Sequence, residues 1–329
     1  MSKKFFSIIL AVAMVFSICV PAYAADISNT KQIALEIPVT EIPSDVLTNH
    51  QNVVSGRTRS AITSTYDEYE ILSMMKAKTT EDLIFEGYSK DVVEDIKSGN
   101  VEERILTITF ERAALSEEEL AKMGYSADEI FVMKNLSGDE TLEQLSTYGI
   151  LADCTCYNYL VEHYYKTSTG KTYFLVSYGW EWDKCPAWVL TDCAGVGWNH
   201  DFHPDETLDT SSKNYNTTYK TYVNQSDASD KKYSSKAMVE KELNTAEDQF
   251  DMNGFYGSAY YVKSGSGTMA LSQTGRQNDA KFSFKYGHNE ILAAPSVGYP
   301  WGVSFSLEGA ESIFMPPEIV YSDFASTKN

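Results

Sequence analysis

The segment from Trp180 to Glu206 gathers most of the side chains that suit chemistry, with four of the five tryptophans, two cysteines and two histidines. Within it, His200, Asp201 and His203 offer imidazole and carboxylate ligands of the kind that bind zinc. The spacing of the two histidines is not the i,i+4 pair of a helical metal site, and Pro204 indicates a loop. We therefore predict a solvated polar loop in preference to a metal site, and we expect no cofactor.

Cys193 lies in a segment with a second chemical interpretation. The sequence Asp-Cys-Ala-Gly-Val that contains it resembles the nucleophile motif of the NlpC/P60 cell-wall peptidases, which is Asp-Cys-Ser-Gly followed by an apolar residue. The resemblance implies that Cys193 is a nucleophile and that a downstream histidine is its base. Ala194 stands where the family has serine, and Gly197 opposes the helix that should follow the cysteine. The candidate bases are His200, His203 and His288.

The cysteines also suit a structural role. After removal of the N-terminal segment described below, four remain, and four cysteines allow three connectivities. An oxidising compartment favours disulfides. A hairpin loop centred on Ser168 and Thr169 would place Cys154 opposite the region of Cys185. We therefore predict a Cys154–Cys185 disulfide, which leaves Cys156 and Cys193 as the second pair.

Aromatic residues are abundant near these cysteines. The chain has 22 Tyr, 15 Phe and 5 Trp. Exposed Tyr and Trp side chains on a sheet are good platforms for sugar rings or peptides, because they combine apolar area with a polar tip. The alternative is that most of these side chains pack between sheets. The candidate binding residues are Tyr178, Trp180, Trp182, Trp188 and Trp198.

The N-terminus predicts secretion. Lys3 and Lys4 precede an apolar run from Phe5 to Val20, and Ala22-Tyr23-Ala24 follows as a small-x-small cleavage site. Residues 1–24 are therefore interpreted as a signal peptide, and no later stretch is apolar enough for a membrane span. Residues 25–63 are polar and contain two prolines, so we expect an extended arm. The protein is expected to be extracellular.

Residues 64–148 predict an acidic helical module with an internal repeat. Thr79 and Ser116 each begin a similar sequence at an offset of 37 residues, and each can cap a short helix. Gly124 can end the first helix in a left-handed conformation, and Ser126 can cap the next. The pattern predicts two helical hairpins. Residues 104–110 are rich in β-branched side chains, which would also suit a strand, and the sequence does not decide between helix and strand there.

From about residue 149 to 329 the pattern changes to that of strands. Residues 154–165 and 172–183 flank a Thr-Ser-Thr-Gly loop, which predicts a hairpin. Later stretches such as 215–223 and 280–286 alternate apolar and polar side chains. The predicted fold class is α+β, a small helical module followed by an antiparallel β-sandwich-like domain.

The net charge argues against a nucleic-acid-binding function. With 27 Lys and Arg against 46 Asp and Glu, the net charge is −19. Clustered bases are needed to bind phosphate backbones, so a nucleic-acid partner is not expected. The leading prediction is a secreted, non-catalytic protein that binds an extracellular protein or a cell-surface glycan through its aromatic β-domain. The alternative is a cell-wall Cys/His hydrolase that uses Cys193 and His288.

Overall fold

The computed structural model describes residues 37–38, 53–54, 57–58, 62–85, 90–187, 191–198, 201–208, 215–241, 244–253, 257, 259–278, 280–288, 311–313, 319–321 and 326–328. The chain divides into two compact units, Met1–Leu35 and Glu36–Asn329, and every described residue belongs to the second. The predicted signal peptide and most of the predicted arm lie outside the described residues. So do Trp188, His200 and the side chain of His288.

Seven helices occupy the described part of the chain between Glu68 and Thr147. They are α3 (Glu68–Ala77), α4 (Thr80–Phe85), α5 (Lys90–Ser98), α6 (Asn100–Ala113), α7 (Glu117–Lys122), α8 (Ala127–Lys134) and α9 (Leu142–Thr147). Capping boxes begin α3, α7, α8 and α9, in which the cap side chain and the residue three positions later satisfy each other's backbone N–H groups. Among the described helices, none combines the length and the hydropathy needed to span a bilayer.

Two pairs of described helices begin at the same offset along the chain. The start of α7 lies 37 residues after that of α4 (117 − 80), and the start of α8 lies 37 residues after that of α5 (127 − 90). Gly124 separates α7 from α8 with a φ of +99°, as the sequence predicts. Residues 104–110, whose conformation the sequence left open, belong to α6. The buried face of α6 explains this result, because Val101, Ile105 and Thr109 share one helical stripe.

In the described part of the chain, the larger sheet has nine strands. Its order is β1 (Ile37–Pro38), β10 (Asp227–Ala237), β9 (Thr217–Asn224), β13 (Tyr260–Thr274), β6 (Lys171–Trp182), β5 (Asp153–Lys166) and β17 (Ser326–Lys328). In addition, β4 (Ile62–Asp67) pairs with β5, and β8 (His203–Pro204) pairs with β13; η1 (Glu206–Leu208) is a short 3-10 helix. All these pairs are antiparallel except β17 with β5. The hairpin predicted around residues 167–170 is confirmed.

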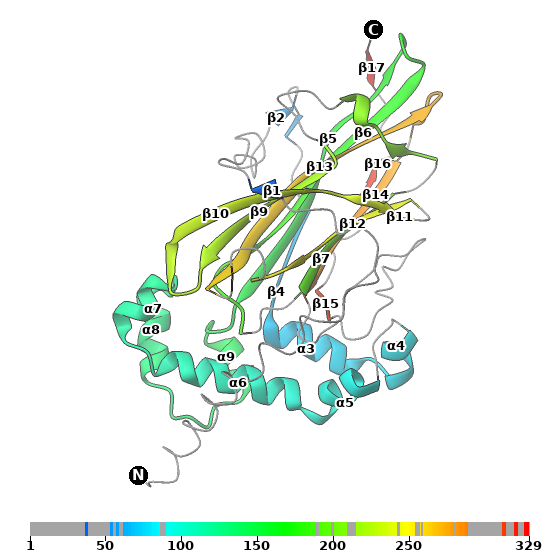
Figure 1. The fold of residues 1–329 in the computed structure, drawn as a ribbon. Helices are drawn as coiled ribbons and strands as arrows, with labels where there is room; N and C mark the ends of the chain where they lie inside the picture. Colours follow the sequence, from blue (N-terminus) through cyan, green and yellow to red (C-terminus); the bar gives the residue numbers. More distant parts are fainter. Residues whose placement is uncertain are drawn as a thin grey trace. The chain divides into compact units, whose positions relative to one another are not determined.

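A second sheet has six strands. It contains β11 (Val239–Lys241), β12 (Thr245–Asp251), β7 (Thr191–Trp198), β14 (Ala280–His288) and β15 (Glu311–Ile313), with β16 (Ile319–Tyr321) also paired to β14. A separate ribbon pairs β2 (Val53–Val54) with β3 (Arg57–Thr58). The described chain is thus a mixed α+β fold with antiparallel sheets. Figure 1 shows the helices gathered at one end of the long strands and the β5–β6 turn at the other.

Aromatic side chains from the two sheets pack against each other. The ring of Trp180 in β6 stacks on Phe250 of β12 at 5.4 Å and on Tyr286 of β14 at 4.8 Å. Gly265 of β13 makes room for this ring, since a Cβ atom there would lie 2.2 Å from Trp180 Cη2. One buried cluster runs from Ile71 in α3 to Tyr286, so the helices and both sheets share a core.

Candidate functional site

The predicted aromatic binding residues are core residues. Trp180, Trp182, Trp198 and Tyr178 are each no more than 1% exposed. The alternation of the second hairpin strand correctly predicts that three of them share a face, but that face is turned toward the other sheet. Trp182 Nε1 donates to the hydroxyl of Tyr286, which itself donates to Asp192. These four side chains therefore stabilise the interior and leave no ring surface for a ligand.

The structure does not support the predicted disulfides. Cys154, Cys156, Cys185 and Cys193 are free and buried. A register shift between Leu160 and Glu162 places Cys154 opposite Trp182, and the chain turns away after that residue. The carbonyl of Cys185 is instead held by Arg112 Nη1 at 2.7 Å. Cys156 and Cys193 belong to strands of different sheets, β5 and β7.

Cys193 is poorly placed for catalysis. Its side chain is fully buried, and burial raises the pKa of its thiol well above 9.0, with the nearby carboxylates of Glu247 and Asp248 adding to the rise. A nucleophilic cysteine needs the opposite shift, toward the thiolate at neutral pH. In the strand ladder Cys193 is paired with Gln249 on one side and Gly287 on the other. The environment therefore opposes the nucleophile that the peptidase-like motif implies.

His203 and Asp201 of the predicted polar loop lie exposed on the surface. His203 Nδ1 lies 3.8 Å from a carboxylate oxygen of Glu240, which is a long contact between two solvated groups. Among the described residues, no group of three or more His, Cys, Asp or Glu side chains is arranged to hold a metal ion.

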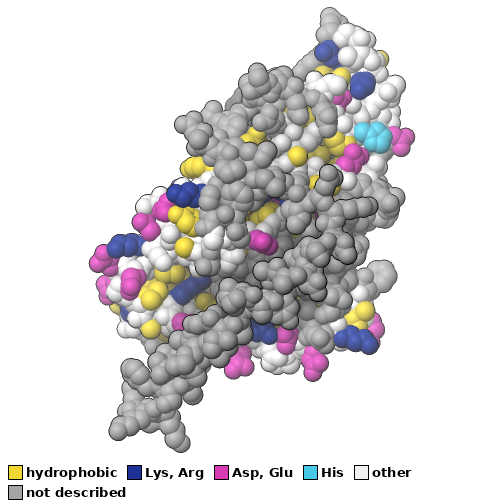
Figure 2. Space-filling model, viewed as in Figure 1, with side chains coloured by type: hydrophobic (Ala, Val, Ile, Leu, Met, Phe, Trp, Pro, Cys, Tyr) yellow, Lys and Arg dark blue, Asp and Glu magenta, His cyan; other side chains and the backbone are white. Residues whose placement is uncertain are grey.

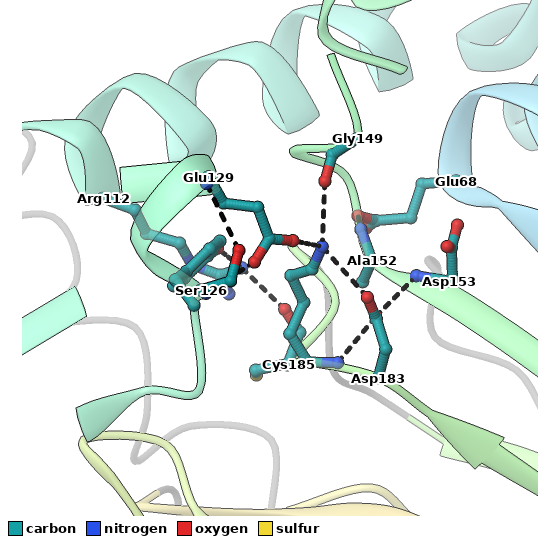
Figure 3. A network of polar contacts seen from close by, with 11 residues as sticks. Glu68, Arg112, Ser126, Glu129, Gly149, Ala152, Asp153, Asp183 and Cys185 are labelled. Carbon is teal, nitrogen blue, oxygen red and sulfur yellow. Dashed lines mark hydrogen bonds and ion pairs between the residues drawn. The ribbon is translucent and has the colours of Figure 1, made fainter. Parts of the chain in front are cut away.

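A polar network joins the helices to the larger sheet (Figure 3). Lys184 Nζ contacts Glu129 of α8 at 2.6 Å, Asp183 at 3.0 Å and the carbonyl of Gly149 at 3.1 Å. Burial alone would lower the pKa of Lys184, but the two carboxylates outweigh it and raise that pKa. Each hydrogen of this ammonium group thus has a partner, which ties α8 and the start of β5 to the end of β6.

Two further side chains complete the junction. Arg112 of α6 donates to the carbonyls of Cys185 and Pro186 at 2.7 and 2.8 Å. The carboxylate of Glu68, 4% exposed, accepts the backbone N–H groups of Ala152 at 3.2 Å and Ala187 at 2.7 Å. Buried charges with all partners present fix one geometry. The network is therefore an attachment of the helices to the sheets.

The outer face of the larger sheet carries the candidate binding surface. Tyr157 and Tyr159 of β5 are half-buried, with ring centres 6.5 Å apart and an interplanar angle of 17°. Tyr157 lies across Gly179, where a Cβ would come within 2.4 Å of its hydroxyl oxygen. Burial raises the pKa of Tyr157, whose hydroxyl also hydrogen-bonds with Ser266. The two rings are thus nearly parallel to each other, and Tyr157 is held against the sheet.

Hydroxyl groups surround this tyrosine pair on neighbouring strands. The Oγ1 atoms of Thr65 and Thr155 are hydrogen-bonded at 2.8 Å, and Ser177 Oγ is hydrogen-bonded with Thr268 Oγ1 at 2.7 Å. The register places these residues with the two tyrosines on one face, since Tyr159 is the direct partner of Ser177. The result is an aromatic and hydroxyl-rich surface built from β4, β5, β6 and β13, which we call the tyrosine face.

The sequence contains the signal for this face, although the prediction did not use it. In β5 the buried residues Cys154, Cys156, Asn158 and Leu160 alternate with Thr155, Tyr157, Tyr159 and Val161, which are partly exposed. Such period-two alternation marks a strand with one face in the core. The binding residues predicted from tryptophan content lie on the inward face of β6 instead.

Comparisons with known proteins find only weak likenesses in solved structures. Clostridium perfringens delta-toxin is 8% identical, with a TM-score of 0.24 over 52% of this chain and 83% of that one. AvmM, which catalyzes macrocyclization in alchivemycin A biosynthesis, is 11% identical, with a TM-score of 0.23 over 53% of this chain and 90% of that one. A pore forming protein is 8% identical, with a TM-score of 0.23 over 51% and 84%. At these scores the likenesses assign neither fold nor function.

No protein-family model matches the sequence, and no curated protein matches it either.

Proposed function

We propose that this is a secreted, non-catalytic binding protein that recognises a cell-surface glycan through the tyrosine face. The observation that carries the proposal is the stacked, half-buried pair of Tyr157 and Tyr159 among hydroxyl groups. Tyrosine rings offer apolar area to the faces of sugar rings, and hydroxyl groups offer hydrogen bonds to sugar hydroxyls.

Preorganisation supports the same proposal. Tyr157 rests on Gly179, and its hydroxyl is hydrogen-bonded within the sheet. A ring that is already fixed loses little conformational entropy when a ligand binds. The wider architecture that we propose is a β-sandwich that carries two helical-hairpin repeats at one end. The Lys184 network would hold the repeats rigidly against the sheets.

The test combines secretion with retention on immobilised glycans. N-terminal sequencing of protein from culture medium should begin at Ala25. The mature wild type should be retained on at least one cell-wall or glycan matrix, and Tyr159→Ala should weaken retention while Tyr159→Phe keeps it, because stacking needs the ring. Tyr148→Ala is the matched control, since Tyr148 is 44% exposed at the end of α9.

Two results would contradict the proposal. If wild-type protein is retained on no glycan matrix, the glycan-binding function is wrong. If Tyr159→Ala and Tyr148→Ala bind like wild type, the ligand binds elsewhere and the tyrosine face is not the site. Circular dichroism of each variant separates loss of binding from loss of fold.

A further inference from the structure

Lysines lie side by side at the tip of the β5–β6 hairpin. Lys166 ends β5, Lys171 begins β6, and the two are direct cross-strand partners. β17 runs beside β5 and places Lys328 at the register position next to Lys166. Like charges directly opposite each other destabilise a sheet. Lys171 Nζ lies 3.3 Å from Asp205, whereas Lys166 makes no ion pair with any described residue.

A second loop adds an arginine and holds the tip together. In the β13–β14 turn, the N–H of Gly275 donates to the carbonyl of Gly170 at 2.8 Å. The hydroxyl of Thr172 donates to the carbonyl of Gly275 at 2.7 Å. Arg276, which is exposed, lies with its Cζ atom 5.7 Å from the centre of the Tyr165 ring. The two turns therefore form one basic tip, which we define as Lys166, Lys171 and Arg276.

The basic tip contrasts with the rest of the chain. Residues 163–172 and 272–278 contain these three bases and no Asp or Glu, whereas residues 64–148 contain 20 acids and 8 bases. Figure 2 shows dark-blue side chains at the end where the β5–β6 hairpin turns in Figure 1. The 14 residues of β5 span about 46 Å. The Debye length in physiological salt is about 8 Å, so the acidic helices are screened from a ligand at the tip.

We propose that the basic tip binds a polyanionic cell-surface polysaccharide, whose charged groups pair with Lys166, Lys171 and Arg276. This inference rests on the proposed glycan-binding function and adds the charge of the ligand and a second contact surface. Lys171 shares a face of β6 with Ser177, the partner of Tyr159, because residues of a strand alternate between faces. The tyrosine face and the two lysines therefore point to the same side of the sheet.

The observations favour a polysaccharide over an anionic membrane. Stable attachment to a bilayer combines charge with inserted apolar groups. The exposed large hydrophobic side chains among the described residues are Ile84, Phe131, Tyr148 and Val239. None of them belongs to the two turns of the basic tip. The tip thus offers charge without an apolar anchor, which suits a hydrated polyanion.

The experiment measures binding of the mature protein to immobilised dextran sulfate, polygalacturonate and neutral dextran by biolayer interferometry. The double variant Lys166→Gln/Arg276→Gln removes two charges from the tip. The matched control Lys90→Gln/Lys122→Gln removes two charges from exposed helical lysines. We expect wild type and control to bind the polyanions alike, and the tip variant to bind about tenfold more weakly. Added salt should weaken wild-type binding more than binding of the tip variant.

Several outcomes would overturn the inference. If the tip variant and the control bind the polyanions equally weakly, binding depends on the net charge of the protein and not on the basic tip. Binding of the tip variant at wild-type strength would place the polyanion elsewhere on the protein. Retention of wild type on neutral glycans only would show that the ligand is not a polyanion. Both results leave the proposed function intact. Binding to vesicles of equal parts phosphatidylglycerol and phosphatidylcholine, without binding to the polysaccharides, would identify a membrane instead. Failure of wild type on every matrix would refute the proposed function itself.

Discussion

Asp248 in β12 is the residue whose neutralisation should destabilise the fold most clearly. Its Oδ2 atom lies 2.6 Å from Lys220 Nζ, and both side chains are 0% exposed. Its other oxygen lies 3.1 Å from Nζ of Lys236, which is 11% exposed. The Lys220 ammonium group also lies 4.9 Å from the centre of the Phe250 ring. One carboxylate thus contacts two ammonium groups between the sheets, and it is a counterion of the fully buried Lys220.

The substitution Asp248→Asn keeps the shape and removes that charge. The buried Lys220 then loses its carboxylate contact at 2.6 Å, and breaking a buried pair in this way costs about 3–5 kcal/mol. At roughly 2–4 °C per kcal/mol for a large domain, the melting midpoint should fall by about 10 °C. Lys236→Met should cost much less, because it leaves the Lys220–Asp248 pair intact.

Thermal unfolding followed by tryptophan fluorescence measures the effect, because Trp180, Trp182 and Trp198 are buried and their emission shifts to the red on exposure. Glu118→Gln is the control, since it removes the same charge from a solvated i,i+4 pair with Lys122. If Asp248→Asn shifts the melting midpoint no further than this control, the argument that Asp248 stabilises buried ammonium groups between the sheets is refuted.

Three further results follow from buried groups. Gly265→Ala should lower the unfolding free energy by about 1–3 kcal/mol in urea titrations, because the new methyl group overlaps the Trp180 ring. Burial alone would raise the pKa of Glu129, but hydrogen bonds from Lys184 and Ser126 bring it below 4.5. The contribution of the ionised Glu129 to folding stability is therefore present above pH 4.5 and is lost as the pH falls through the folded-state pKa. Glu129→Gln should remove this pH dependence and flatten that part of the acid unfolding curve. A thiol reagent should find no reactive cysteine, including Cys193, in the native mature protein and four after unfolding without reductant; fewer than four would indicate disulfides.

Local physical chemistry predicts much of the secondary structure. Thr79 and Ser116 accept the backbone N–H groups of Asp82 and Glu119 at 3.0 and 3.2 Å, as expected for helix caps. The β5–β6 hairpin also follows from short-range signals, because its loop and its alternation lie in adjacent residues. Each of these features depends on neighbours only a few positions away.

The surroundings of the tryptophans and cysteines depend on residues far away in the chain, and local sequence patterns do not predict them. Alternation shows that Trp180 and Trp182 share a face, but only the packing of β6 against the second sheet makes that face internal. The position of Cys154 depends on a one-residue register shift in β5 that has no sequence marker. The carbonyl of Cys185 is held by Arg112, 73 residues earlier in the chain.

Substitution of two unfavourable residues of β5 should stabilise the fold in both cases, but only one of the substitutions should weaken ligand binding. Asn158 is 0% exposed, and neither polar atom of its side chain hydrogen-bonds to a described residue. Asn158→Leu keeps the number and branching of the side-chain heavy atoms and removes the unpaired amide, so it should raise the unfolding free energy by about 1–3 kcal/mol in urea, with glycan binding unchanged. Lys166→Glu should also stabilise the fold, because it replaces repulsion from Lys171 with attraction. If the basic tip binds a polyanion, Lys166→Glu must weaken that binding. A stabilised Lys166→Glu variant with full polyanion affinity would mean that the paired lysines serve no ligand.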